Sequence, residues 1–133
     1  MVKQIAVFLE NRSGRLLELT KVLERDKINI DCLSIAETTD YGIVRIITRD
    51  ADATVGALKK AGYAASVSEL VGVELSDEPG GLAAVLKVLA QNNIGIEYLY
   101  TFARCEKLAV VLLKVADEAA TIKALKDSGI KVL

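Results

Sequence analysis

The chain has 133 residues, the length of one ordinary domain, and its 52% hydrophobic and 26% charged residues exclude a disordered protein. The formal net charge of −1 provides no basic field for nucleic acid or for an acidic membrane surface. No apolar run reaches the roughly 18 residues of a membrane-spanning helix. The N-terminus enters a strand pattern without a signal-peptide layout, so we expect a cytoplasmic protein that binds neither nucleic acid nor membrane.

The first half of the chain predicts the order strand, helix, strand, strand, helix, strand. An apolar strand at 4–9 ends in a polar turn, and Leu16, Leu19 and Leu23 then recur with the spacing of an amphipathic helix. The predicted elements are a strand at 4–9, a helix at 13–25, a strand at 28–38, a turn at 39–42, a strand at 43–48, a helix at 51–61 that ends at Gly62, and a strand at 63–67.

The second half predicts the same order again. Its elements are a strand at 71–75, a helix marked by Leu82, Val85, Leu86 and Leu89, a strand at 94–103, a hairpin near Cys105, a strand at 108–115, a helix at 118–127 that ends at Gly129, and a short strand at 130–133. This order is that of the split βαβ sandwich. We therefore expect an α+β protein with two ferredoxin-like βαββαβ units, at 1–69 and 70–133, each an antiparallel sheet with both helices on one face.

An internal repeat supports this division. At an offset of 66, residues 7–36 match residues 73–102 at 10 of 30 positions, where chance in so apolar a chain gives roughly two or three. The identical pairs are Val7/Val73, Leu9/Leu75, Gly14/Gly80, Leu16/Leu82, Lys21/Lys87, Val22/Val88, Leu23/Leu89, Ile28/Ile94, Ile30/Ile96 and Leu33/Leu99.

The repeat contains two copies of a polar turn at the start of a helix, Asn11-Arg12-Ser13-Gly14 and Asp77-Glu78-Pro79-Gly80. Backbone N–H groups and the positive end of the helix dipole suit such a turn to a carboxylate. We expect the glycines, with Gly81, to let a ligand approach, and Pro79 to preset the first helical φ. Asn11 and Asp77 are expected to cap the helices or to accept from an ammonium group. Well-capped helices begin in the same way, so a purely architectural role also stays open.

The residue inventory excludes most catalytic chemistry. The chain has no histidine, which removes Ser-His and Cys-His pairs and histidine metal sites. Cys32 and Cys105 form no C-x-x-C, so inert, partly buried thiols are favoured over a redox or metal role. An acylphosphatase-like site has only a faint counterpart in Arg12 beside Asn11. RNA-recognition modules place aromatic residues on a basic surface, which this chain lacks. We expect no enzyme, no cofactor and no metal.

Two strands bear on assembly. Residues 108–113 are apolar at successive positions and 43–47 nearly so, which predicts burial of both faces. Because the helices cover one face, we expect a sister unit or a second subunit on the other, and a homodimer. Tyr98, Tyr100 and Phe102 alternate along one strand, and they suit either packing or a ligand pocket.

The pattern Val-x-Leu-x-Asn/Asp-x-Ser/Pro-Gly-x-Leu, then a helix and Ile-Asn-Ile at 28–30 or Ile-Gly-Ile at 94–96, resembles the ACT domain. The resemblance covers the whole chain as two copies. The second copy has the family's turn in full, whereas the first has Ser13 where proline is usual and Asn11 where aspartate is common. ACT domains are small regulatory modules that bind amino acids, either attached to biosynthetic enzymes or as free-standing tandem proteins.

The resemblance implies that the turns hold a ligand α-carboxylate between paired modules, and that the strand after the first helix, often from the neighbouring module, lines the side-chain pocket. The implied ligand-binding residues are Asn11, Arg12, Ser13, Gly14, Asn29, Ile30, Asp77, Glu78, Pro79, Gly80, Gly81, Gly95 and Ile96. The apolar surroundings favour a branched-chain or other apolar amino acid. The alternative is a regulatory subunit that acts mainly by contact with a biosynthetic enzyme, such as an acetolactate-synthase-type partner.

Overall fold

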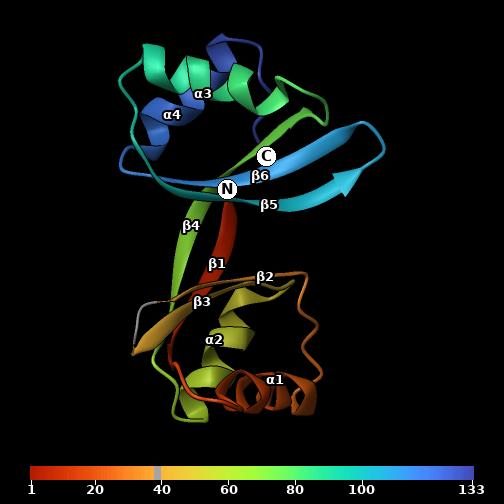
Figure 1. Ribbon diagram of the computed structural model, residues 1–133, viewed down its shortest axis with the longest axis vertical. Helices are drawn as coiled ribbons and strands as arrows, with labels where there is room; N and C mark the ends of the chain where they lie inside the picture. Colours follow the sequence, from red (N-terminus) through yellow and green to blue (C-terminus); the bar gives the residue numbers. More distant parts are fainter. Residues whose placement is uncertain (38–39) are drawn as a thin grey trace. The chain divides into compact units, whose positions relative to one another are not determined.

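The computed structural model describes residues 1–37 and 40–133, and the chain forms two compact units. The N-terminal unit is Lys3–Ser68, and the C-terminal unit is Met1–Val2 together with Glu69–Leu133. Met1 joins the second unit because its ammonium group donates to the Leu133 carbonyl at 2.7 Å. In Figure 1 the two helices of each unit lie on the same side of that unit's strands. The expected fold class, α+β with two βαββαβ repeats, is confirmed.

The N-terminal unit has the strand order β2-β3-β1-β4, with β1–β3 and β2–β3 antiparallel. Its elements are β1 (Val2–Glu10), α1 (Arg15–Arg25), β2 (Cys32–Glu37), β3 (Tyr41–Ile47), α2 (Ala51–Lys60) and the first part of β4 (Ala65–Ser76). Alternate residues of β1 and β3 face the helices because strand side chains alternate. They form the core with buried helical residues, namely Ile5, Val7, Leu9, Val44, Ile46, Leu19, Leu23, Ala51 and Leu58.

The C-terminal unit repeats this arrangement with β4, α3 (Gly81–Gln91), β5 (Ile96–Cys105), β6 (Leu108–Val115) and α4 (Glu118–Asp127). The strand β6 lies between β4 and β5, and both pairs are antiparallel. The C-terminal residues run along the other edge of β4, where Glu74 donates to Lys131 at 3.0 Å and Leu133 donates to Gly72 at 2.9 Å. The predicted strand at 130–133 is thus one isolated bridge, Val73 to Val132. Among the described residues, no helix is long and apolar enough to cross a membrane.

Three predicted strand boundaries are wrong. The strands predicted at 63–67 and 71–75 are one continuous strand, β4, because Ser68 and Glu69 continue the extended backbone. The strands predicted to begin at Ile28 and Ile94 begin at Cys32 and Ile96 instead.

The late start of β2 and β5 has a common cause. Each preceding helix ends through a left-handed residue, Lys27 (φ 56°) or Asn93 (φ 54°), and the next N–H bonds back to the helix at 2.9 Å. The other two helices end in the same way at Gly62 and Gly129, as predicted. The predicted turn at 39–42 lies partly outside the described residues.

The doubly apolar strand β6 is buried on both faces only in its middle. Val111 and Leu113 belong to the core beneath the helices, while Leu112, between them, faces the other way and is also 0% exposed. Its neighbours across the sheet are Gly72 and Tyr100. The prediction is therefore confirmed for Leu112. Leu108 is 46% exposed in the single chain, and its burial by a second subunit stays a prediction.

The aromatic residues of β5 are only partly as predicted. Tyr98 and Tyr100 share a face and stack with ring centroids 6.5 Å apart and planes 14° apart. A register shift between Thr101 and Ala103 interrupts the alternation at Phe102. Of the two cysteines, Cys32 is half-buried, and burial raises the pKa of its thiol. The prediction for Cys105 lies outside the described side chains.

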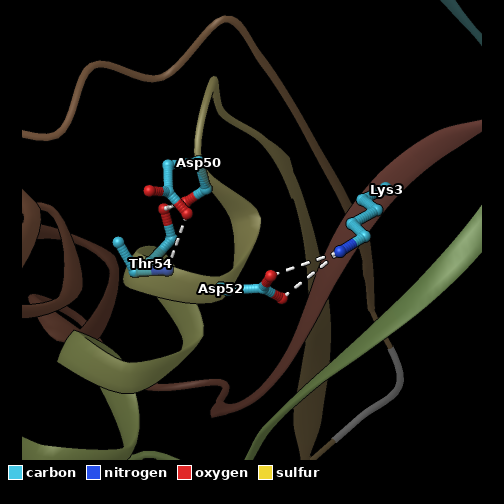
Figure 2. Close-up of polar contacts among 5 residues, drawn as sticks. Lys3, Asp50, Asp52 and Thr54 are labelled. Carbon is cyan, nitrogen blue, oxygen red and sulfur yellow. Dashed lines mark hydrogen bonds and ion pairs between the residues drawn. The ribbon is translucent and has the colours of Figure 1, made fainter.

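The second helix of each unit begins with the same side-chain cap. Asp50 and Asp117 each accept a hydrogen bond at 2.9 Å from the N–H three residues later. Buried Thr54 donates to the Asp50 carbonyl at 2.7 Å, as Thr121 does to Asp117. Figure 2 shows Asp50 and Thr54 at the start of α2, with Lys3 of β1 3.2 Å from the carboxylate of Asp52.

We predict that Asp117→Ala lowers the free energy of unfolding by about 1 kcal/mol, since the capped N–H of Ala120 loses its acceptor. Asp117→Asn is the matched control, because asparagine caps a helix equally well. Urea denaturation of the three proteins measures both effects. Equal losses in the two variants would contradict a capping role.

Candidate functional site

The two polar turns enter α1 and α3 through a left-handed glycine. Gly14 (φ 85°) and Gly80 (φ 89°) occupy the N-cap positions, and neither helix has a side-chain cap. The first helical N–H of each bonds back into the turn, from Arg15 to Arg12 at 3.2 Å and from Gly81 to Glu78 at 3.0 Å. Helix geometry gives no intrahelical acceptor to the next two N–H groups, which belong to residues 16–17 and 82–83. These N–H groups and the helix dipole can bind an anion.

The predicted caps at Asn11 and Asp77 are wrong because the glycines hold the N-cap positions themselves. The carboxylate of Asp77 instead accepts from Nε and Nη2 of Arg104, at 2.9 and 2.7 Å. The predicted role of Pro79 is also wrong, since it precedes the N-cap and is not the first helical residue.

Glycine has different roles at positions 80 and 81. A Cβ at Gly14 or Gly80 would meet nothing within 4 Å, so a ligand can approach the backbone there. A Cβ at Gly81 would lie 2.0 Å from the Ser76 carbonyl oxygen. Gly81 therefore serves the packing of α3 against the end of β4 and does not extend the approach path.

The charged residues of the first turn already have partners. The Nε of Arg12 lies 3.4 Å from Glu10, and both side chains are exposed. The guanidinium of Arg15 pairs with Glu18 at 2.6 Å and lies 5.1 Å from the ring centroid of Tyr63. The hydrogen bond that Arg15 donates to Glu18 raises the pKa of Arg15, which stays charged. The remaining turn residues Ser13, Glu78 and Pro79 are exposed.

Within one unit, the candidate ligand-binding residues near the second strand lie far from the glycine turn. The turn lies at the start of the first helix, and the candidates follow its end, about 16 Å along the axis for 11 residues. Asn29 donates to Asp31 at 3.2 Å and lines a separate cleft with Arg49 and Asp50. Ile30 and Ile96 pack against the two cores. A role for Asn29, Ile30, Gly95 and Ile96 in a neighbouring module's site stays a prediction.

Two clefts flank the Gly80 turn. The larger, which we call the Ile130 cleft, has a volume of about 490 Å³, and its lining includes Leu75, Gly80, Ala84, Val85, Ile130 and Lys131. The Arg104 cleft, of about 340 Å³, is lined in part by Asp77, Leu82, Thr101 and Arg104.

Two clefts also flank the Gly14 turn. The Tyr63 cleft has about 300 Å³ and contains Arg15, Tyr41 and Tyr63, and the Ile35 cleft has about 240 Å³ and contains Asn11, Leu16 and Ile35. Sequence reasoning missed Glu18, Tyr63 and Arg104. Comparison of the non-identical positions of the repeat would have indicated Glu18, which corresponds to Ala84 at the offset of 66.

The profile of the ACT domain pair family matches residues 1–126. The chain belongs to this family. The solved structure of protein BT0572 from Bacteroides thetaiotaomicron is 39% identical, with a TM-score of 0.93 over 99% of this chain and 91% of that one. The regulatory subunits of aspartate kinase from Thermus thermophilus and Thermus flavus are 16% and 17% identical, with TM-scores of 0.69 and 0.65. Both alignments cover 96% of this chain and 92% of the other, and they show the shared fold. A search of curated proteins found no match.

Membership of the family confirms the coarse functional expectation. ACT domain pairs are typical of small-molecule-binding regulatory domains, and ACT domains are regulatory rather than catalytic. In this ACT domain pair the uncapped glycine turns are the candidate sites, and the clefts beside them give the space for a small molecule.

We predict that Gly81→Ala lowers the free energy of unfolding by about 1–3 kcal/mol, because its Cβ would overlap a backbone oxygen that cannot rotate away. Gly56→Ala, in the exposed interior of α2 with nothing near its Cβ, should instead raise stability by about 0.5–1 kcal/mol. Chemical denaturation measures both. A Gly81→Ala protein as stable as the parent would contradict the packing role of Gly81.

Proposed function

We propose that this ACT domain pair is a regulatory protein that senses a free amino acid and holds the ligand α-carboxylate at its glycine turns. The observation that carries the proposal is the contrast among the four helices. α2 and α4 are capped by aspartate, whereas α1 and α3 begin at glycines that have no side chain to cap them. The first-turn N–H groups of these two helices have no intrahelical acceptor and no side-chain cap, so they are available to an external acceptor such as a ligand carboxylate.

The surroundings of the Gly80 turn support an amino acid with an apolar side chain. The Ile130 cleft has Leu75, Val85 and Ile130 in its lining, beside the open backbone of Gly80. Glu74 also lines it, and its carboxylate, 3.0 Å from Lys131, offers an acceptor for a ligand ammonium group. Such a pocket, mostly apolar with a few polar groups, is usual for small ligands. A branched-chain amino acid fits this description.

The proposal includes a second copy of the chain. In a homodimer the strand-two residues Asn29, Ile30, Gly95 and Ile96 can line the site of a neighbouring module, as the family resemblance implies. Asn11–Gly14 would be the corresponding turn of the first unit. We place the protein in the cytoplasm, where free amino acids and their biosynthetic enzymes meet.

A second candidate function is regulation by direct contact with a biosynthetic enzyme. Phe8 and Tyr41 are 60% and 55% exposed, and they meet edge to face with ring centroids 6.4 Å apart. Exposed aromatic pairs are favourable anchors for a protein partner. The Thermus structures are named as regulatory subunits of aspartate kinase, which makes such a partner reasonable.

We predict that one or a few of the twenty standard amino acids raise the melting temperature by several degrees. A ligand that binds only the folded state adds about 2.7 kcal/mol of stability at one hundred times its Kd. Thermal denaturation with each amino acid at millimolar concentration tests this, with calorimetric titration as the second readout. If no amino acid raises the melting temperature and the titrations are flat, the sensing proposal fails and the enzyme-contact function replaces it.

We further predict that Gly80→Asp abolishes the ligand-induced shift. The new carboxylate would lie in the open space beside α3, where its negative charge repels the ligand carboxylate. Gly80→Asn is the matched control, since asparagine has the same size, tolerates positive φ and lacks the charge. Calorimetry should show binding by Gly80→Asn and none by Gly80→Asp. Equal affinities of the two variants would move the site away from this turn.

A further inference from the structure

Three equivalent positions differ in size between the two units. Arg15 and Glu18 correspond to Gly81 and Ala84 at the offset of 66 residues. Tyr63 corresponds to Ile130 at an offset of 67, because each directly follows the left-handed glycine, Gly62 or Gly129, at the end of the second helix. The structure supports the correspondence at both ends of the cleft. Arg15 and Gly81 are the first residues of α1 and α3, and the N–H of Tyr63 and of Ile130 each bonds back to the preceding helix, at 3.0 and 2.9 Å.

In the N-terminal unit these side chains, which we call the Arg15 cluster, contact one another. The guanidinium of Arg15 lies 2.6 Å from Glu18 on one side and 5.1 Å from the Tyr63 ring centroid on the other. Its side chain is only 21% exposed. The cluster therefore occupies space between the start of α1 and the chain segment that follows α2.

In the C-terminal unit the same space is open. Gly81 has no side chain, Ala84 has one methyl group, and Ile130 has no polar end. The Ile130 cleft measures about 490 Å³, against about 300 Å³ for the Tyr63 cleft. The apolar side chains of Leu75 and Val85 line it. The smaller side chains of the C-terminal unit thus accompany a wider cleft.

The two helix starts also differ in charge. α1 has an acidic residue in its first turn, Glu18, whereas α3 has none. A carboxylate near a helix N-terminus offsets the positive end of the dipole. The first turn of α1 therefore contains a carboxylate of its own, and the first turn of α3 does not.

We infer that each chain binds one amino acid with an apolar side chain, in the Ile130 cleft, and that the Arg15 cluster closes the equivalent site of the N-terminal unit. This inference rests on the proposed function and makes it more specific. The ligand side chain lies against Val85 and Ile130, its carboxylate faces the start of α3, and its ammonium group faces Glu74. The side chains of the Arg15 cluster thus take the position that the ligand has in the C-terminal unit, and the two repeats differ in function.

Calorimetric titration of the full-length chain with L-leucine, L-isoleucine, L-valine and L-methionine tests the inference. We expect one site per chain for at least one of them. Ala84→Leu, which fills the Ile130 cleft from an exposed helix position, should weaken binding at least tenfold. Ala90→Leu is the matched control. It is an exposed residue of the same helix, lies near the opposite end of α3 and does not line the Ile130 cleft, so its affinity should match that of the parent.

A second variant opens the other cleft. Arg15→Ala combined with Glu18→Ala should raise the stoichiometry from one to two amino acids per chain. We expect this protein to fold because Glu18 is exposed and, within the described residues, the buried Nε of Arg15 has no hydrogen-bond partner to lose. If the double variant does not fold, comparison of Ala84→Leu with Ala90→Leu tests the inference alone.

The outcomes separate this inference from the proposed function. Two equal sites per parent chain, or unchanged affinity in Ala84→Leu, would overturn the inference and leave amino-acid sensing intact. Binding that is lost equally in Ala84→Leu and Ala90→Leu would also overturn it, because the effect would not belong to the cleft. Failure of all twenty standard amino acids to bind the parent chain would overturn both.

Discussion

Each unit of this protein depends on one backbone constraint, a left-handed glycine between its first strand and its first helix. The strand end is fixed by the neighbouring hairpin, through the Asn11 N–H to Asp40 at 2.9 Å and the Asp77 N–H to Lys107 at 2.7 Å. The chain must then turn into a helix within a few residues, and positive φ allows this at little cost only for glycine. Because glycine takes the N-cap position, no side chain covers the first-turn N–H groups. A structural requirement of the turn therefore also creates a place for an anion.

The repeat uses this constraint in two ways. In the N-terminal unit, Glu18 offsets the helix dipole and Arg15 packs between Glu18 and Tyr63. In the C-terminal unit the equivalent positions are small or apolar, and the Ile130 cleft lies open beside Gly80. Duplication of a binding module commonly leaves one copy free to change. Here the substitutions in the first copy add side chains to the site. We propose that only the second copy senses the ligand.

The sequence predicted the fold well because its signals are local and periodic. The spacing of Leu16, Leu19 and Leu23 predicted α1, and Gly62 and Gly129 predicted the ends of α2 and α4. The offset of 66 residues predicted two like units. The late starts of β2 and β5, which follow the left-handed residues Lys27 and Asn93, were missed because left-handed residues other than glycine have no clear sequence signal.

The site was less predictable because its contacts join distant residues. Arg15 meets Tyr63, and Asp77 meets Arg104, through the sheet topology and not through any short motif. The capping rules favoured Asn11 and Asp77, yet the backbone placed glycine at the N-cap, so the true cap could be recognised only from φ. Gly81 looked like part of an open loop, and only the position of the Ser76 oxygen shows that it is tightly packed.

The most direct test of the central claim is the amide NMR spectrum of the ¹⁵N-labelled chain during titration with the amino acid that raises its melting temperature most. The account predicts that the N–H resonances of Leu82 and Ala83, at the start of α3, shift in proportion to ligand occupancy. The equivalent resonances of Leu16 and Leu17 should stay in place. Saturable binding that leaves Leu82 and Ala83 unmoved, or that shifts the two helix starts equally, would contradict it.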